Sequence, residues 1–480
     1  MQRYEHAFGK NDIRGIYGKD ITEELFYNIA FGYIEWIKKH NNKPAEKLKI
    51  SVCMDARLHS PSLKKALISG LVESGAGHIE DLGLAPTPIG YYSEIAHNLD
   101  GAMIITASHN PSEYNGLKMT YNARTLNEAQ IKELKELIFG NWRMFSTDTV
   151  LLHGQEILRA DIIPEYIAEM KDKFGGIGGG IKVVVDSANA TGGIVGPELY
   201  RQLGCEVVEL FSEPDGRFPN HHPNPSVLST LDTLCTTVIK EGADFGIAYD
   251  GDSDRIGIVD SQGIPLTGDK LLLIYAMDII DKKPAVVSEV KCSQVFFDTI
   301  NNAGASAVMC KTGHGYIKDK MKETNAILGG EMSGHMFFKD RYYGFDDAIY
   351  AGCRMIEIVS KHKRNNPDFK LESLLGVFDR VYTSDEIRFP CPNELKKRVL
   401  ASMKDEVKNN PDMFGEPIIK IVMLDGMRII FKDGFALIRQ SNTEPVFTLR
   451  FEGGSRQRCE HYKNCMLEKL NAIINKYSAA

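Results

Sequence analysis

The chain has 480 residues, which is too many for one hydrophobic core and typical of about three or more domains. Apolar residues make up 43% of it and charged residues 25%, as in ordinary water-soluble globular proteins. The formal net charge of −7 leaves no basic footprint for nucleic acid. An anionic ligand would therefore have to be drawn in by local clusters of cations.

Membrane and export signals are not evident in the sequence. The first residues lack the apolar core of a signal peptide. The nearest approach to a membrane span, Leu271 to Ile280, is interrupted by Asp278 and falls short of the ~20 residues that a spanning helix needs. Nine scattered cysteines without a Cys-x-x-Cys pair are typical of reduced thiols. We expect a cytoplasmic protein, a monomer or weak homodimer, with neither a membrane nor a nucleic-acid partner.

One order of elements occurs three times along the chain: a strand, a helix, a second strand and, further on, a last strand that runs into a polar loop. Strands that alternate with helices form parallel sheets with right-handed crossovers, so we predict three related α/β/α domains with mostly parallel sheets. The predicted elements are 49–54, 62–75, 78–82 and 102–105 in the first round, 182–186, 196–203, 206–210 and 244–249 in the second, and 285–290, 295–303, 307–310 and 326–329 in the third.

The composition of the elements changes after the third round. Four strands, 418–422, 427–431, 436–439 and 447–451, lie between two helices, 394–407 and 457–477, which indicates a separate α+β domain. The four predicted domains are 1–155, 156–260, 261–372 and 373–480. We expect their reactive loops to face one central cleft.

The first reactive loop, Thr-Ala-Ser-His-Asn-Pro at 106–111, follows an apolar strand. Open α/β sheets place their ligands at such strand ends. The loop would bring together the hydroxyl of Ser108, the imidazole of His109 and the ammonium group of Lys118. Such a set suits a serine nucleophile that accepts a phosphoryl group, because cations can hold the charge of the phosphate. An ordinary polar turn is the alternative. Arg14, in a glycine-punctuated opening segment, is either a surface charge or a phosphate clamp.

The second loop, Asp-Gly-Asp-Ser-Asp-Arg at 250–255, presents carboxylates at alternate positions after a strand. Asp250, Asp252 and Asp254 would form an oxygen-rich pocket suited to Mg²⁺, and without a cation they would repel one another. An EF-hand is excluded, because Arg255 stands where that loop needs glycine and Ser261 where it needs glutamate. An aspartyl phosphotransferase with Asp250 as nucleophile stays open.

Two further loops carry weaker signals. Glu331, Ser333 and His335 lie between glycines and suit hydrogen bonding to sugar hydroxyls, although a structural turn would look the same. The loop at 439–445 offers a guanidinium, two hydroxyls and backbone amides, a fair phosphate site formed by Arg439, Ser441, Asn442 and Thr443. Lys291 and His314 occupy the remaining loops of the third round, where a lone histidine is more often structural than catalytic.

The four loop motifs occur together and in order: 106–111, 250–255, Gly-Glu-Met-Ser-Gly-His at 330–335, and Arg-Gln-Ser-Asn-Thr-Glu-Pro at 439–445. In this the chain resembles the α-D-phosphohexomutase superfamily along essentially its whole length. Within the superfamily it is most similar to the bacterial phosphomannomutase/phosphoglucomutase branch, which the segments 218–225, 311–314 and 343–347 also fit.

The resemblance implies that the fourth domain is similar to the TATA-binding protein in topology. It also implies roles for single residues. Ser108 would carry a phosphoryl group, and its phosphoserine would join Asp250, Asp252 and Asp254 around one Mg²⁺. Catalytic positions would be Ser108, Lys118, Arg14, His109 and His335, with Lys118 and Arg14 the candidates for proton transfer and charge stabilisation. Substrate would be held by Arg255, Lys291, His314, Glu331, Ser333, His335, Arg439, Ser441, Asn442 and Thr443.

The implied reaction interconverts hexose 1-phosphate and hexose 6-phosphate, of mannose or glucose or both, with a hexose 1,6-bisphosphate as intermediate and activator. The alternatives are a phosphoglucosamine mutase, which Met332 and Asn442 disfavour, an enzyme that uses Asp250 as nucleophile, and a non-catalytic sugar-phosphate-binding regulator. Two residues depart from the family pattern. Ser253 replaces a frequent glycine, which we expect to be harmless because its side chain need not coordinate. Asn11 replaces an aromatic residue.

Overall fold

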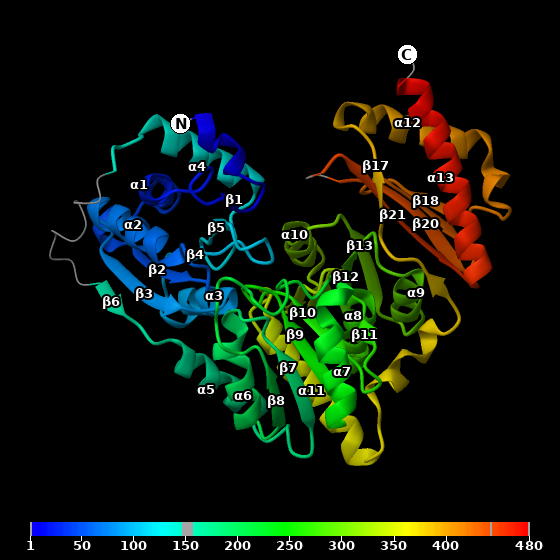
Figure 1. Cartoon of the computed structure of the whole chain (residues 1–480), viewed down its shortest axis with the longest axis horizontal. Coiled ribbons are helices and arrows are strands. Elements are labelled where there is room, and N and C mark those ends of the chain that lie inside the picture. The colour runs from blue at the N-terminus through cyan, green and yellow to red at the C-terminus, as the bar shows by residue number, and fades with distance from the viewer. Residues whose placement is uncertain (1, 146–156, 442–443, 479–480) are drawn as a thin grey trace. The chain divides into compact units, whose positions relative to one another are not determined.

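The computed structural model describes residues 2–145, 157–441 and 444–478 (Figure 1). The chain forms two compact units. The first unit consists of Met1–Leu266, Ser333–Met336 and Phe345–Leu371, and the second of Thr267–Met332, Phe337–Gly344 and Glu372–Ala480. The predicted third domain, 261–372, is thus divided between both units. The predicted boundary at 155/156 lies outside the described residues, and the exact domain limits stay predictions.

The first sheet of the first unit has six strands in the order β1-β5-β4-β2-β3-β6. β2 pairs parallel with β3 and β4, and β3 pairs parallel with β6, while β5 pairs antiparallel with both β1 and β4. The sheet is therefore mostly parallel, as predicted, with an antiparallel edge. Its strands are β1 (Ile13–Ile16), β2 (Lys49–Met54), β3 (His78–Leu84), β4 (Gly101–Ile105), β5 (Tyr114–Met119) and β6 (Ile157–Arg159).

Helices cover both faces of this sheet. The core on one face joins strand residues such as Val52 and Met103 to α1 (Glu23–Asn41), α2 (Ser60–Glu73) and α4 (Glu128–Gly140). Cys53 and Ile104, the next residues along β2 and β4, turn to the other face and lie against Gly90 of α3 (Thr87–Ala96). This alternation follows from the two-residue period of a strand. Four residues of α1 at helical spacing, Leu25, Ile29, Tyr33 and Ile37, are buried in this core.

The second sheet of the first unit has the order β11-β10-β9-β7-β8. β7 pairs parallel with β8 and β9, and β10 pairs antiparallel with β9 and β11. The strands are β7 (Lys182–Asp186), β8 (Glu206–Leu210), β9 (Phe245–Tyr249), β10 (Ile256–Val259) and β11 (Pro265–Leu266). The accompanying helices are α5 (Ile163–Phe174), α6 (Gly196–Gln202), α7 (Asp232–Glu241) and α11 (Ala348–Asn365).

The second unit begins with a four-stranded sheet of order β13-β12-β14-β15. β12 pairs parallel with β13 and with β14, as predicted for the third round. The strands are β12 (Ala285–Glu289), β13 (Ser306–Cys310), β14 (Leu328–Gly330) and β15 (Met336–Phe338), and the helices are α8 (Gly268–Asp278), α9 (Gln294–Asn302) and α10 (His314–Thr324). Ile317 and Met321 of α10 pack against Val287 of β12 in the core.

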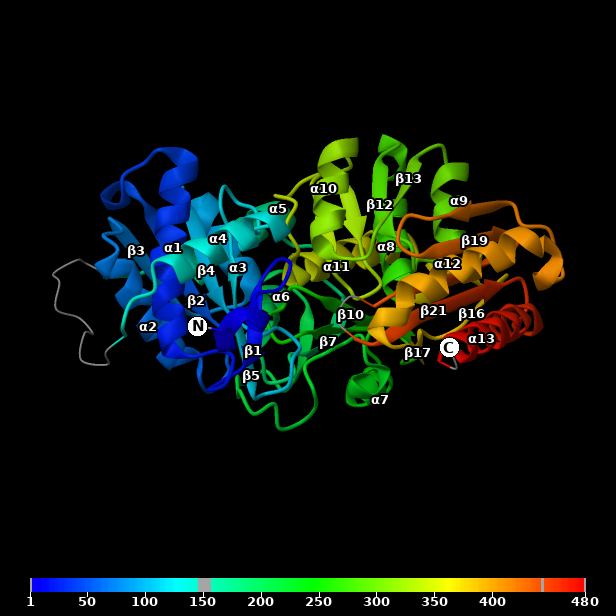
Figure 2. The ribbon, with the colours of Figure 1, turned by 90° about the horizontal axis from the view of Figure 1, so that it is seen from above.

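An antiparallel sheet of order β16-β21-β20-β19-β18, with β17 paired to β21, completes the second unit. Figures 1 and 2 show α12 (Asn393–Asn409) beside α13 (Arg456–Ser478), and both contribute to a core shared with the sheet. The predicted α+β arrangement is confirmed. The strands are β16 (Tyr382–Thr383), β17 (Ile387–Pro390), β18 (Lys420–Val422), β19 (Met427–Phe431), β20 (Gly434–Gln440) and β21 (Val446–Gly453).

Several elements have no counterpart in the sequence prediction, among them β1, β5, β10, α3, α7 and α11. β5 shows why. Its residues, Tyr-Asn-Gly-Leu-Lys-Met, include poor strand formers, and the segment is extended because β1 and β4 pair with it from both sides. No helix in the described ranges has both the length and the apolarity needed to span a lipid bilayer.

The close crossing of α1 and α2 depends on Gly70. A Cβ at this position would lie 2.4 Å from the Tyr27 carbonyl oxygen and 2.7 Å from Ala30 Cβ, both on α1. We expect Gly70→Ala to lower the free energy of unfolding by about 1–3 kcal/mol through overpacking. Denaturant titration would measure this. Gly140→Ala, where nothing lies within 4 Å of the new methyl group, is the control. Equal stabilities of the two variants would contradict the packing argument.

A charged cluster in the first unit makes stability depend on pH. His97 lies 2.6 Å from Glu80 and 3.2 Å from Glu165 of α5. Burial alone would lower the pKa of His97, but the hydrogen bonds and charges of the two glutamates raise it above 6.5. A raised pKa stabilises the fold fully below the unfolded value, and this contribution is lost as pH rises through the folded pKa.

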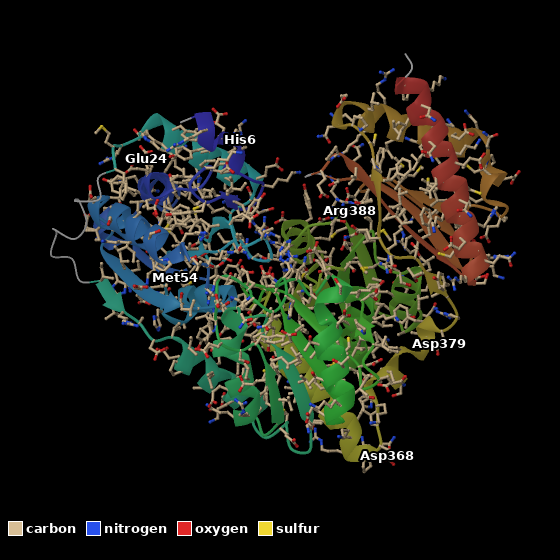
Figure 3. All side chains as sticks on the ribbon, viewed as in Figure 1. His6, Glu24, Met54, Asp368, Asp379 and Arg388 are labelled. Atoms are coloured by element: carbon tan, nitrogen blue, oxygen red, sulfur yellow. The ribbon has the colours of Figure 1, made fainter. Side chains whose placement is uncertain are left out.

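We therefore expect His97→Gln to destabilise the protein more at about pH 6 than at about pH 9. Thermal unfolding at both pH values would show the difference. His6→Gln, at an exposed position labelled in Figure 3, is the matched control. A penalty for His97→Gln that does not change with pH would rule out the charged imidazole as its source.

Candidate functional site

Ser108 lies at the carboxyl end of β4, where the sequence placed it. The residue is buried and adopts a left-handed backbone conformation, with φ 49°. Its Oγ donates a hydrogen bond to Asp250 Oδ2 at 2.7 Å and lies 3.1 Å from His109 Nδ1. Burial, followed by the charges of Arg255 and Arg14, lowers the pKa of His109. Its imidazole is therefore neutral beside the serine hydroxyl.

The three aspartates of the second loop follow β9 and are brought together in the first unit. Asp250, Asp252 and Asp254 are all buried, and one oxygen from each lies within 4.8 Å of the others. Burial, reinforced by Asp254 and Asp252, raises the pKa of Asp250 well above its ordinary range. Asp252 Oδ1 and Asp254 Oδ1 are buried without a hydrogen-bond partner among the described residues. Three crowded carboxylates with open oxygens fit a hard divalent cation such as Mg²⁺.

Lys118 and Thr87 engage the same carboxylates. From β5, Lys118 Nζ donates to Asp252 Oδ2 at 2.6 Å and also to Asp254. Thr87 Oγ1 donates to the same Asp252 oxygen at 2.6 Å. Burial would lower the pKa of Lys118, but Asp252 and Asp254 outweigh it and raise the pKa well above its usual value. Lys118 is consequently a fixed cation at this position. The sequence prediction missed Thr87, the first residue of α3.

Ser253 corrects one expectation. Its side chain was expected to be harmless because it need not coordinate a metal. However, Ser253 adopts φ 60°, a left-handed conformation that glycine reaches without steric cost. Its buried hydroxyl has no hydrogen-bond partner in the part of the chain that the structure describes. Serine at this position therefore destabilises the backbone by about 1 kcal/mol relative to glycine, because it is held in a strained conformation.

Arg14 is half-buried, with 23% of its side chain exposed, and is held by hydrogen bonds within the first unit. It donates from Nη1 to Asn110 Oδ1 at 2.8 Å and from Nη2 to Asp12 at 2.5 Å. Burial would lower its pKa, but Asp12 and then Asp252 raise it. Asn110 belongs to the loop of Ser108, so Arg14 joins β1 to that loop. Asn11 instead donates to the Leu126 carbonyl at 3.3 Å.

Arg255 and His335 form a chain of contacts beside the aspartates. Arg255 Nε donates to His335 Nε2 at 3.0 Å, and His335 Nδ1 lies 2.9 Å from Asp346 Oδ2. Asp254, His335 and Asp346 also have metal-like spacing, but protein groups contact both ring nitrogens of His335. The aspartate triad is therefore the better metal site. Ser333, in the same unit, accepts a hydrogen bond on its backbone oxygen from Ser226 Oγ at 3.1 Å.

The second unit contains the other predicted residues. Glu331 Oε1 accepts a hydrogen bond from the Gly313 amide at 2.6 Å, so the loops of Glu331 and His314 meet. Lys291 Nζ lies 3.1 Å from Glu386 and 3.7 Å from Glu289. Burial would lower the pKa of Lys291, but Glu289 and Glu386 raise it. Glu289, which the sequence prediction missed, ends β12 and accepts hydrogen bonds from Thr312 and Met332.

Arg439 and Ser441 lie at the end of β20. Arg439 Nε donates to Asp425 Oδ2 at 3.1 Å, and the same oxygen accepts the Thr312 amide at 3.1 Å. Asp425 thus joins the Arg439 loop to the loop before His314. Lys396 of α12 is buried and donates to the carbonyls of Ser441, at 2.9 Å, and of Glu444. Asn442 and Thr443 lie outside the described residues. Asp425 and Lys396 were not found from the sequence.

A buried serine against a carboxylate cluster suited to Mg²⁺ is typical of enzymes that transfer phosphoryl groups. Sequence profiles of four domains of one family match the chain in order: "Phosphoglucomutase/phosphomannomutase, alpha/beta/alpha domain I" at residues 5–142, domain II at 164–263, domain III at 267–375 and the C-terminal domain at 386–469. The chain belongs to the phosphoglucomutase/phosphomannomutase family.

Individual relatives agree along the whole length. A phosphomannomutase/phosphoglucomutase of Pseudomonas aeruginosa is 37% identical over 97% of this chain and 96% of its own. A phosphoglucomutase of Neisseria meningitidis is 35% identical over 95% of both chains. The crystal structure of a family protein from Burkholderia thailandensis, 31% identical, superposes with a TM-score of 0.85 over 97% of both chains. The family resemblance and the four-domain α/β fold are confirmed.

Binding of Mg²⁺ should be measurable without turnover. We expect MgCl₂ to raise the thermal midpoint, since a ligand at 100 times its Kd adds about 2.7 kcal/mol. Asp252→Asn should weaken this response, because it removes one of the three metal-spaced carboxylates. Asp172→Asn, at an exposed position on α5, should respond like the wild type. An undiminished Mg²⁺ response in Asp252→Asn would place the ion elsewhere.

Proposed function

We propose that this chain interconverts the 1- and 6-phosphates of a hexose, mannose or glucose or both, through a phosphorylated Ser108 and a hexose 1,6-bisphosphate. The observation that carries the proposal is the 2.7 Å hydrogen bond from Ser108 Oγ to Asp250, within a buried triad of carboxylates. That arrangement occurs in a chain that matches all four family domains. The named relatives are phosphomannomutases and phosphoglucomutases.

The proposed transfer follows from the charges around Ser108. The phosphoryl group leaves Ser108 Oγ for the free hydroxyl of the bound hexose phosphate. The P–O bond to Ser108 Oγ breaks and a P–O bond to the sugar oxygen forms, while the proton lost by the sugar hydroxyl is balanced by the proton that the released Ser108 Oγ takes up. Turning of the bisphosphate and reversal of the step return the other phosphate to Ser108. Lys118 and Arg14 stabilise the negative charge on the transferring group. Asp252 and Asp254 raise the pKa of Lys118, which favours its role as a cation and hydrogen-bond donor beside the transferring group.

Asp250, Asp252 and Asp254 would hold one Mg²⁺, and phosphoserine oxygen would complete the set. When bound, the ion supplies positive charge to the phosphoryl group, as in other phosphoryl-transfer enzymes. Neutral His109, with Nδ1 3.1 Å from Ser108 Oγ, provides a polar contact beside the serine without adding charge. Arg255, positioned by His335, contacts phosphate or sugar.

The second unit would hold the substrate. Glu331 and Ser333 are the proposed partners of sugar hydroxyls, and Lys291 and His314 are further proposed substrate residues. Arg439, Ser441, Asn442 and Thr443 hold the phosphate that is not reacting. The proposed domains 1–155, 156–260, 261–372 and 373–480 each supply one loop to that cleft. A hexose bisphosphate is the expected activator, because an escaped intermediate leaves Ser108 unphosphorylated. All nine cysteines are free thiols, which supports the proposed cytoplasmic location.

The test compares the wild type with Ser108→Ala on mannose 1-phosphate, glucose 1-phosphate and glucosamine 1-phosphate, with Mg²⁺ and a trace of glucose 1,6-bisphosphate. Formation of the 6-phosphate is the readout. We expect turnover of the first two substrates and a loss of about 10³-fold or more in Ser108→Ala, because the nucleophile is absent. Ser187→Ala, which removes a buried hydroxyl without a described partner after β7, should keep wild-type activity.

The other possible outcomes would each support a different function. Turnover of glucosamine 1-phosphate alone would identify a phosphoglucosamine mutase with the same chemistry. A Ser108→Ala variant as active as the wild type would exclude Ser108 and direct attention to Asp250. A wild type without turnover of any of the three substrates would leave the binding regulator as the better description.

A further inference from the structure

Arg57 is a buried arginine that no sequence motif singled out. It follows β2, whose last residue, Met54, is labelled in Figure 3. β2 lies next to β4 in the sheet, so Arg57 emerges beside the loop that β4 delivers. Its side chain is 0% exposed, and that of its partner Asp55 is 2% exposed. A fully buried guanidinium is costly unless all of its donors are satisfied.

All five donors of Arg57 find acceptors. Nε donates to Asp55 Oδ2 at 3.1 Å. The four remaining N–H groups meet four backbone carbonyls of the Ser108 loop: Ser108 at 2.8 Å, Asn110 at 2.6 Å, Pro111 at 2.6 Å and Tyr114 at 3.0 Å. A single planar guanidinium thus hydrogen-bonds to four backbone carbonyls of one loop and fixes their positions relative to one another. Asp55 is fixed in turn by Ser60 Oγ at 2.7 Å.

The geometry bears directly on the orientation of Ser108. Its left-handed conformation is unfavourable for a residue other than glycine and persists only where surrounding contacts enforce it. Arg57 holds the Ser108 carbonyl from one side, and Gly251 packs against that carbonyl so closely that a Cβ there would lie 2.2 Å from it. With its carbonyl fixed, the side chain of Ser108 is directed to Asp250.

We propose that Arg57 is a positioning residue that orients Ser108 toward the carboxylate triad through the backbone carbonyls of the 108–114 loop. Arg57 is not a catalytic residue, because it is fully enclosed and touches neither the Oγ nor the carboxylates of the triad. Its partner Asp55 sets the rotation of the guanidinium. Phe218, whose ring centroid is 5.3 Å from Arg57 Cζ, covers it. The inference rests on the proposed role of Ser108.

The test measures the rate at which Ser108 of the dephosphorylated enzyme takes a phosphoryl group from glucose 1,6-bisphosphate, by mass spectrometry of the peptide that contains Ser108. Arg57→Ala removes all five donors, and Arg57→Lys keeps the charge but offers at most three. We expect Arg57→Ala to be slower by about 100-fold, as for a misplacement near 1 Å, and Arg57→Lys by about 10-fold or more. The KM for glucose 1-phosphate should change little, because Arg57 touches no proposed substrate residue.

Stability and metal binding separate positioning from a general structural role. All variants are assayed below their thermal midpoints, with the folded fraction checked by circular dichroism. Arg57→Ala should keep the rise in thermal midpoint with MgCl₂, since the Asp250 loop follows a different strand, β9. Arg354→Met, which removes another fully buried arginine of the first unit, should lose stability but phosphorylate Ser108 at the wild-type rate. Arg57→Lys is the variant to use if Arg57→Ala does not fold.

Three results would overturn the inference. The first is a phosphorylation rate of Arg57→Ala or Arg57→Lys within about threefold of the wild-type rate. The second is an Arg57→Ala variant that loses the Mg²⁺ response together with the phosphorylation rate, and the third is a loss of rate in Arg354→Met equal to that in Arg57→Ala. Failure of the proposed function would look different. In that case the wild type itself would not become phosphorylated on Ser108, whatever the behaviour of the Arg57 variants.

Discussion

Mutual repulsion among three buried carboxylates is the constraint on which the first unit depends. Asp250, Asp252 and Asp254 follow one strand end, shielded from water, where like charges can coexist only beside cations. Lys118 of β5, in the first sheet, supplies one such positive charge. The carboxylate oxygens without a hydrogen-bond partner among the described residues are available to a metal ion. The same negative charge raises the pKa of Lys118. Lys118 therefore stays charged and connects the aspartate loop to β5. Because β5 pairs with β4, this contact also connects the aspartate loop to the strand that precedes Ser108.

Buried arginines solve a second problem, that of holding irregular loops rigid. A loop at a strand end exposes carbonyl groups that no ladder satisfies, and a guanidinium can donate hydrogen bonds to several of them at once. Arg57 does so for the Ser108 loop. In the second unit Arg428 donates to the carbonyls of Val290 and Cys292, at 2.5 and 2.8 Å, and Arg450 donates to the carbonyl between them, that of Lys291. Both reactive loops are therefore fixed through their backbones, which leaves their side chains available for chemistry.

Fold and site make different contributions to the assignment. The α/β architecture is shared with the solved family structure from Burkholderia thailandensis. Such a likeness establishes the scaffold and not the substrate. The proposed phosphoryl transfer rests instead on Ser108 and the neighbouring carboxylates. Mannose and glucose differ in the configuration of one hydroxyl group, and the proposed sugar-binding residues Glu331 and Ser333 are compatible with both.

The sequence by itself determined the elements with strong local patterns. Three predicted strands, 49–54, 182–186 and 206–210, have the observed bounds, because their apolar runs end abruptly in turn residues. The four loop motifs likewise pointed to Ser108 and the aspartate triad. Tertiary structure alone decided β5, which needs partners on both sides, the left-handed strain at Ser253, and the contacts of Arg57. Those contacts join residues about fifty positions apart in the chain, and sequence periodicity reports only on neighbours within a few positions.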